Sequence, residues 1–145
     1  MILVDVNLLL YAENSSAKEH PIAKAWWESA LLSEIEMAFD WTTILAFLRI
    51  TTSRQVFPMP LSSKQATERM DLWLTRRHVH IVQPGPNHWK ILSGLIDLHQ
   101  IVSKSVPDAH LAAVAIENGW DLYSSDEGFS KYRGLRWINP IATTN

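Results

Sequence analysis

At 145 residues and a formal net charge of −2, the chain is the size of one ordinary domain and lacks the overall basic field of a dedicated nucleic-acid binder. It has no cysteine, which excludes disulfides and thiolate metal sites, so a metal would need oxygen or imidazole ligands. No apolar run approaches the roughly 20 residues that cross a bilayer. We therefore expect a single cytoplasmic domain, residues 1–145, without a membrane segment.

Predicted strands alternate with predicted helices along the chain. The strands are short runs rich in apolar and β-branched residues, at 2–6, 36–39, 79–82, 122–124 and 135–138. The helices carry apolar residues at helical spacing, at 22–32, 42–52, 62–74, 88–101 and 107–118. Pro107 and Gly119 are typical boundaries for the last of these helices. The alternation predicts an α/β fold with a mostly parallel central sheet and helices on both faces.

The first predicted strand contains an acidic residue. Asp5 stands in VDV at the carboxyl end of a strand otherwise made of Ile, Leu and Val, where burial of an unpaired carboxylate is costly. Parallel α/β sheets bind ligands outside the carboxyl ends of their strands, which is where Asp5 falls. The alternative is that Asp5 or Asn7 only caps a helix starting at Leu8.

Two further acids follow predicted boundaries later in the chain. Asp108 lies in the first turn of a helix, where the dipole alone would favour it, but it heads the apolar stripe of that helix and is expected to point inward. Asp126 follows the strand in LYSS, although it would equally serve as a cap in the loop SSDEGF. We expect these two acids to meet Asp5 at one end of the sheet.

Three carboxylates in one place suit a hard divalent cation. Mg²⁺ and Mn²⁺ prefer carboxylate and water ligands in a near-octahedral shell. Such a site would orient and deprotonate a water molecule and would neutralise charge on a phosphodiester during in-line displacement. The pattern predicts Asp5, Asp108 and Asp126 as catalytic and metal-binding residues.

The histidines and tryptophans invite other readings. No two of the six histidines form an H-x-x-x-H arrangement with an acid between them, so they are predicted to be surface or helix-face residues. His110 lies two residues after Asp108, a separation that points the two side chains apart on a helix. The tryptophans are expected mainly as anchors of the core or of an interface.

Several segments resemble the PIN-domain ribonucleases, specifically VapC-type toxins of bacterial type II toxin–antitoxin pairs. They occur in the family's order and span nearly the whole chain: VDVNLLLYA, LAFLRITTSRQVFP, VPDAHLAAVAIENG, LYSSDEGF and GLRWINP. The resemblance implies a three-layer fold, an Mg²⁺- or Mn²⁺-dependent endoribonuclease acting on structured RNA such as transfer or ribosomal RNA, a homodimer, and inhibition by a cognate antitoxin. It carries over Asp5, Asp108 and Asp126 as metal-site acids, with Asn7 and Ser124 as hydrogen-bonding supports.

The chain departs from the family pattern at two positions. Many members place a glutamate in the helix after the second strand, whereas WTTILAFLRI has Ala46 and Phe47 near that position. Asp40, just before this helix, is a candidate replacement, and a site with three acids is the alternative. Gly128 stands where relatives often have a further aspartate, and Glu127 would substitute only if its loop turned inward.

Two rival functions remain at this level. A signalling receiver domain would need a phosphoacceptor Asp and a Lys at the ends of separate strands, and the predicted strands supply no convincing pair. A PIN-fold module that has lost catalysis and only binds RNA or an antitoxin is the stronger rival, because the expected second acid is missing.

Overall fold

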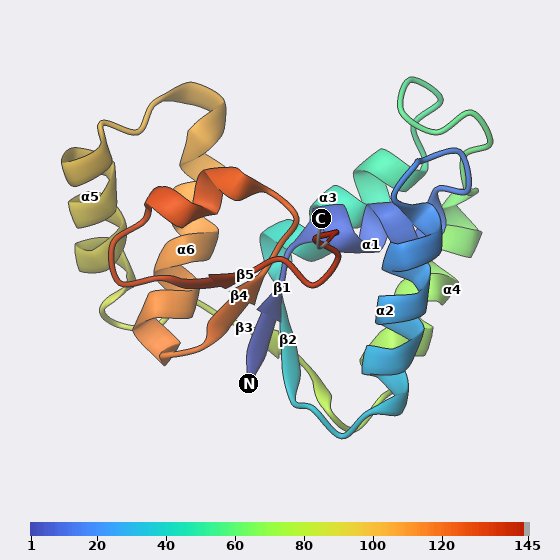
Figure 1. Cartoon of the computed structure of the whole chain (residues 1–145), viewed down its shortest axis with the longest axis horizontal. Coiled ribbons are helices and arrows are strands. Elements are labelled where there is room, and N and C mark those ends of the chain that lie inside the picture. Colours follow the sequence, from blue (N-terminus) through green and yellow to red (C-terminus); the bar gives the residue numbers. More distant parts are fainter. Residues whose placement is uncertain (144–145) are drawn as a thin grey trace.

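The computed structural model describes residues 1–143 and places one parallel sheet between two layers of helices (Figure 1). The strands are β1 (Ile2–Val4), β2 (Met37–Asp40), β3 (Val79–Val82), β4 (Asp121–Tyr123) and β5 (Arg136–Ile138). Their order across the sheet is β3-β2-β1-β4-β5, and all four pairings between these neighbours are parallel. The predicted three-layer α/β fold is confirmed.

The helices divide between the two faces of the sheet (Figure 1). One face carries α1 (Val6–Glu13), α2 (His20–Leu32), α3 (Trp41–Thr51) and α4 (Ser63–Leu74). The other carries α5 (His88–His99) and α6 (Val106–Asn118), while 3₁₀ turns η1 (Ser103–Ser105) and η2 (Glu127–Lys131) complete the chain. No helix within residues 1–143 is long and apolar enough to span a bilayer.

The strand order creates a switch point between β1 and β4. From β1 the chain adds β2 and then β3 on one side, and it then crosses through α5 and α6 to add β4 and β5 on the other side. In open α/β sheets, ligands bind outside the carboxyl ends of the two strands that flank such a reversal. The fold therefore marks the carboxyl ends of β1 and β4 before any side chain is considered.

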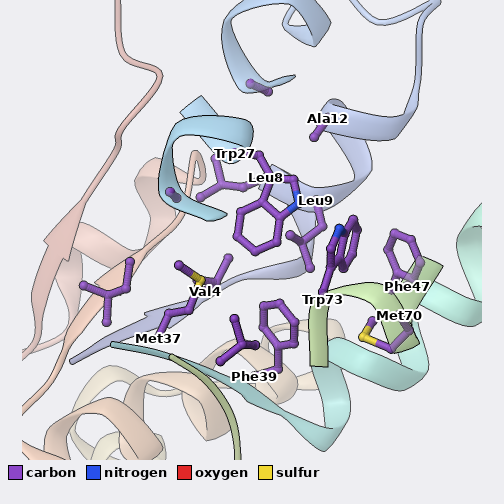
Figure 2. Close-up of a cluster of buried hydrophobic side chains, with 14 of the residues drawn as sticks. Val4, Leu8, Leu9, Ala12, Trp27, Met37, Phe39, Phe47, Met70 and Trp73 are labelled. Atoms are coloured by element: carbon purple, nitrogen blue, oxygen red, sulfur yellow. The ribbon is translucent and has the colours of Figure 1, made fainter. Parts of the chain in front are cut away.

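An aromatic cluster fills the space between the sheet and helices α1 to α4 (Figure 2). The ring of Trp73 lies edge-on to Trp27, with centroids 5.2 Å apart, and to Phe47, with centroids 4.9 Å apart. Such edge-to-face pairs add to the free energy gained from burying large rings. Met37 and Phe39 of β2 reach this cluster from the sheet, which fixes α3 and α4 against β2.

The opposite face is packed by small side chains. From Ala109 to Ala115, α6 buries every residue except His110, and most of these residues are alanine. Short side chains let the helix lie close to Leu3, Ala38 and Leu122 of the sheet. The helix ends at Gly119, whose φ of +68° makes the left-handed cap that was predicted there.

The first strand is shorter than predicted. It ends at Val4 because the Asp5 carboxylate accepts a hydrogen bond from the Val6 N–H and starts α1 at Val6. That helix was expected only as the alternative beginning at Leu8. The sequence VDVNLLL suits both a strand and a helix, and the cap decides between them. The remaining predicted strands and helices are present, with ends within two residues of those observed.

Candidate active site

Four acidic residues follow or face the carboxyl ends of the inner strands. Asp5 directly follows β1, and its N–H donates to the Tyr123 carbonyl at 2.9 Å, which extends the pairing of β1 with β4. Asp126 lies three residues beyond the end of β4, and Asp40 is the last residue of β2. Asp108 comes from the first turn of α6. Asp5, Asp108 and Asp126 thus arise from separate elements that meet at the switch point.

Ser124 connects Asp5 to the loop after β4. Its hydroxyl is fully buried and donates to Asp5 Oδ2 at 2.6 Å. The Ser124 Oγ atom also accepts hydrogen bonds from the Asn7 side-chain amide at 3.1 Å and from the Asp126 N–H at 3.0 Å, so this hydroxyl uses its full hydrogen-bonding capacity. Asn7 and Ser124, expected as supports, therefore hold Asp5 and the Asp126 loop in one network.

The three carboxylates share one electrostatic field. Burial, followed by the nearby Asp108 and Asp126 carboxylates, raises the pKa of Asp5 from its usual 3.8 to about 6, against the lowering effect of its hydrogen bonds from Ser124 and Val6. Burial and the Asp126 carboxylate likewise raise the pKa of Asp108, while Lys131 opposes the change. Each negative charge makes the others less favourable, so a cation at this position would relieve all of them.

The chemistry of these groups fits a hard cation such as Mg²⁺ or Mn²⁺. The donors are carboxylate oxygens, and the buried hydroxyl of Tyr132 has no hydrogen-bond partner within the described part of the chain. Burial, and then Asp108 and Asp126, raise the pKa of Tyr132, which places this orphaned hydroxyl within electrostatic reach of the acids. Across residues 1–143, no three His, Asp or Glu side chains already stand in a metal-holding arrangement, so a cation would have to draw the carboxylates together.

The loop after β4 is shaped around Asp126. The Asp126 Oδ1 atom accepts the Gly128 N–H at 2.8 Å and so begins η2. A Cβ atom at Gly128 would lie 3.0 Å from that same oxygen, tighter than ordinary contacts allow. A glycine here keeps the Asp126 carboxylate undisturbed, and Glu127, the first residue of η2, is exposed.

Asp40 belongs to a second polar network. It caps α3, and its Oδ2 atom accepts the Thr42 N–H, the Thr42 hydroxyl and the His110 Nε2–H, the first and last of these at 2.9 Å. Burial alone would raise the pKa of Asp40, but the hydrogen bonds from His110 and Thr42 outweigh burial and lower this pKa. The structure thus holds Asp40 as an anion at the carboxyl edge of β2, bound to α6.

His88 and His110, predicted with the other histidines to be surface or helix-face residues, do lie on helices, but their side chains are turned towards the interior. Their side chains are only 12% and 20% exposed, and His88 Nε2 lies 2.9 Å from His110 Nδ1. His110 does point away from Asp108 as expected, but it points towards Asp40 instead of solvent. The one signal in the sequence was that His110 and Glu117, seven residues apart, share a face of α6.

Comparisons with known proteins identify the family. The model of the PIN domain family matches residues 2–135. Ribonuclease VapC33 of Mycobacterium tuberculosis is 34% identical over 141 residues, covering 97% of this chain and 99% of that protein. Ribonuclease VapC37 of the same organism is 34% identical over 142 residues, covering 98% and 99%. The chain therefore belongs to the PIN domain family and, within it, to the VapC ribonucleases.

Solved structures agree with this fold. VapBC2 from Rickettsia felis, bound to promoter DNA, aligns with a TM-score of 0.69 at 16% identity, covering 96% of this chain and 98% of that chain. VapC20 of Mycobacterium tuberculosis, a toxin that cleaves the Sarcin-Ricin loop, aligns with a TM-score of 0.68 at 17% identity, covering 94% and 99%. At these identities the likeness concerns the fold.

Proposed function

We propose that the protein is the toxin of a toxin–antitoxin pair, an endoribonuclease that hydrolyses phosphodiester bonds in structured RNA with Mg²⁺ or Mn²⁺ held by Asp5, Asp108 and Asp126. The observation that carries the proposal is the convergence of these carboxylates at the β1–β4 switch point, where burial, and then the charges of Asp108 and Asp126, raise the pKa of Asp5 to about 6. Perturbed pKa values caused by desolvation and by neighbouring like charges are typical of catalytic sites. The ribonuclease relatives support the same reaction.

A bound divalent ion would neutralise charge on the phosphate and lower the pKa of a water molecule. The residues of this chain would orient the carboxylates that bind the ion and would attract the RNA phosphate. Ser124 orients Asp5 through Oδ2, and since a carboxylate oxygen has more than one lone pair, Asp5 keeps acceptor capacity for the cation. Lys131, which lowers the pKa of Asp108, is close enough to contribute positive charge towards an RNA phosphate.

An antitoxin partner has a suitable surface. The relatives of known structure include toxin–antitoxin complexes from Klebsiella pneumoniae and nontypeable Haemophilus influenzae. In this chain a groove of about 400 Å³ between α2 and α4 combines apolar lining, including Leu31 and Leu72, with charged side chains such as Lys24, Glu28 and Arg69. It would accept the apolar side of an antitoxin segment. With a net charge of only −2, a homodimer in the cytoplasm would enlarge the surface available to RNA.

The binding-module alternative predicts no cleavage by the purified chain. The test incubates the protein, freed of any partner, with total bacterial RNA over a range of Mg²⁺ and Mn²⁺ concentrations. Asp5→Ala and Asp108→Ala are compared with Asp121→Asn, a change at the amino end of β4 on the far edge of the sheet. Discrete metal-dependent cuts that persist in Asp121→Asn and vanish in the other two support the nuclease. Intact RNA with every folded protein supports the binding module.

A further inference from the structure

Two imidazoles in series connect the starts of α5 and α6, on one face of the sheet, to Asp40, which precedes α3 on the other face. Asp40 precedes α3, His88 is the first residue of α5, and His110 lies near the start of α6. His110 Nε2 lies 2.9 Å from Asp40 Oδ2, and His110 Nδ1 lies 2.9 Å from His88 Nε2. We call Asp40, His110 and His88 the histidine tie.

The partners fix which atoms of the histidine tie carry protons. An ionised Asp40 only accepts, so the Nε2 atom of His110 carries a hydrogen. With a neutral imidazole, the Nδ1 atom of His110 then accepts from the Nε2–H of His88. Each ring orients the next, and His110 uses both of its nitrogens inside the protein. Neither nitrogen of His110 is left for substrate, so any role of this residue in the reaction is indirect.

A separate contact anchors the start of α5 to α6. Glu117 Oε2 accepts the Gly85 N–H at 3.0 Å, and Oε1 accepts the Asn87 N–H at 2.9 Å. A Cβ atom at Gly85 would lie 2.4 Å from Glu117 Oε1, so this approach requires a glycine. The loop before His88 is therefore bound to α6 through Glu117, two helical turns after His110. This contact places His88 beside His110.

The first turn of α6 has few other polar anchors. Its N-cap residue, Ser105, makes no side-chain hydrogen bond to the helix. His110 reaches the carboxyl end of β2 through Asp40, while Asp108, two residues earlier, projects from another side of the same turn. Strand β2 pairs directly with β1, and Asp5 directly follows β1. The histidine tie thus connects the turn that carries Asp108 to the strand beside Asp5.

We propose that the histidine tie sets the position of Asp108 relative to Asp5, and that His110 is a positioning residue for cation binding. The inference rests on the proposed function, because the placement of Asp108 matters only if its carboxylate binds the ion. Asp40 then contributes through α6, with three donors gathered on its Oδ2 atom, and does not itself replace the missing glutamate as a ligand.

Mn²⁺ affinity tests this proposal without relying on cleavage. Free Mn²⁺ is measured by electron paramagnetic resonance during titration of the wild type, His110→Ala and His110→Gln, with thermal unfolding recorded for each. Removing His110 is expected to raise the Mn²⁺ dissociation constant about tenfold, the size typical for residues that orient metal ligands. Glutamine can still donate to Asp40, so His110→Gln should recover most of that loss.

Two further variants separate positioning from ligation and from general destabilisation. Asp40→Asn keeps an acceptor oxygen for His110 and Thr42, so it should bind Mn²⁺ nearly as the wild type does. The matched control is His80→Gln, which removes the histidine of an exposed pair with Glu36 and should leave Mn²⁺ affinity unchanged. If His110→Ala fails to fold, His88→Leu tests the same link and should produce a smaller rise in the dissociation constant.

The outcomes distinguish the possible failures. Wild-type Mn²⁺ affinity in a folded His110→Ala, or in His88→Leu if that variant must replace it, would overturn the positioning role and leave the nuclease untouched. Weakening by Asp40→Asn as strong as that caused by Asp108→Ala would make Asp40 a ligand and also overturn the proposal. A wild-type protein that neither binds Mn²⁺ nor cuts RNA would remove the proposed function and this inference together.

Discussion

The two edges of the sheet carry similar charged residues in different surroundings. At the carboxyl edge, Asp40 and Ser124 are buried, and burial raises the pKa of Asp5. At the amino edge, Glu36 pairs with His80 and Asp121 pairs with Arg136, with most of these side chains about half exposed or more. Exposed pairs contribute little to stability. Desolvation and convergence, and not the presence of acids, distinguish the candidate site.

Cavity size does not separate the two edges, because a hollow of about 420 Å³ lined in part by Ser125 and Glu127 lies near the carboxyl edge. Another hollow of about 420 Å³ lies near the amino edge, lined by Glu34, Glu36, Arg77 and His78. It does not coincide with the switch point of the sheet, where the fold expects a ligand. The comparison therefore favours charge environment over cavity size as the guide to function, and the following changes test it.

The largest effect is expected from Asp5→Asn. The change removes one of the three converging charges and leaves the side-chain volume almost unaltered. If Asp5 binds the ion or a transferred proton, metal-dependent RNA cleavage should fall by at least about 100-fold. Steady-state cleavage of a mapped RNA, with Asp121→Asn as the amino-edge control, measures this. Equal losses in both variants would contradict a special role for the carboxyl edge.

The same substitution should make the apo protein more stable at neutral pH. The pKa of Asp5 is about 6 in the folded chain and 3.8 ordinarily, so the folded state binds the proton more tightly. Stability is therefore lost as the pH rises from about 4 to 6, by roughly 3 kcal/mol. Asp5→Asn avoids this loss but disturbs a hydrogen bond worth about 1 kcal/mol, leaving a net gain of about 2 kcal/mol at pH 7.5.

Urea unfolding at several pH values, without added metal, measures this difference. The gain from Asp5→Asn should disappear near pH 4, where the wild-type carboxyl is protonated in the folded chain. Parallel stability curves for the two proteins between pH 4 and pH 7 would contradict the raised pKa of Asp5 and, with it, the contrast between the two edges.

Tyr132→Phe should affect RNA cleavage and the unfolding free energy differently, and both effects should be smaller than those of Asp5→Asn. The hydroxyl has no partner within the described residues, so removing it should leave the unfolding free energy unchanged or raise it by about 1 kcal/mol. If it donates to a water of the bound ion, cleavage should fall roughly two- to tenfold, the equivalent of one neutral hydrogen bond. Unchanged cleavage would make Tyr132 only a packing residue.

The sequence predicted what local patterns determine. Periodicity located the alternating elements, and Gly119 after an apolar helix predicted its left-handed cap. The position of Asp5 followed from its place after a strand. Even there, the two interpretations of Asp5 were not exclusive, because it caps α1 and also faces the other acids.

The remaining features depend on contacts between distant segments. The pair of Asp40 and His110 spans 70 residues of sequence, and the pair of His88 and His110 spans 22. No spacing rule links such residues. The packing of α6 on the sheet brings His110 to Asp40, and the packing of α5 on α6 brings His88 to His110. The orphaned hydroxyl of Tyr132 is likewise invisible in the sequence, because a tyrosine in a loop usually finds a partner or water.

The smallest effect is expected at the amino edge. His80 and Glu36 are 45% and 52% exposed, so their pair should contribute about 0.5 kcal/mol or less at low salt. His80→Gln should therefore leave both RNA cleavage and Mn²⁺ affinity unchanged and lower the unfolding free energy only slightly, an effect that 0.5 M salt should erase because exposed charges are screened. A rise in the Mn²⁺ dissociation constant comparable to that expected for His110→Ala would show that histidine–acid pairs at either edge support the site, and the distinction based on burial would fail.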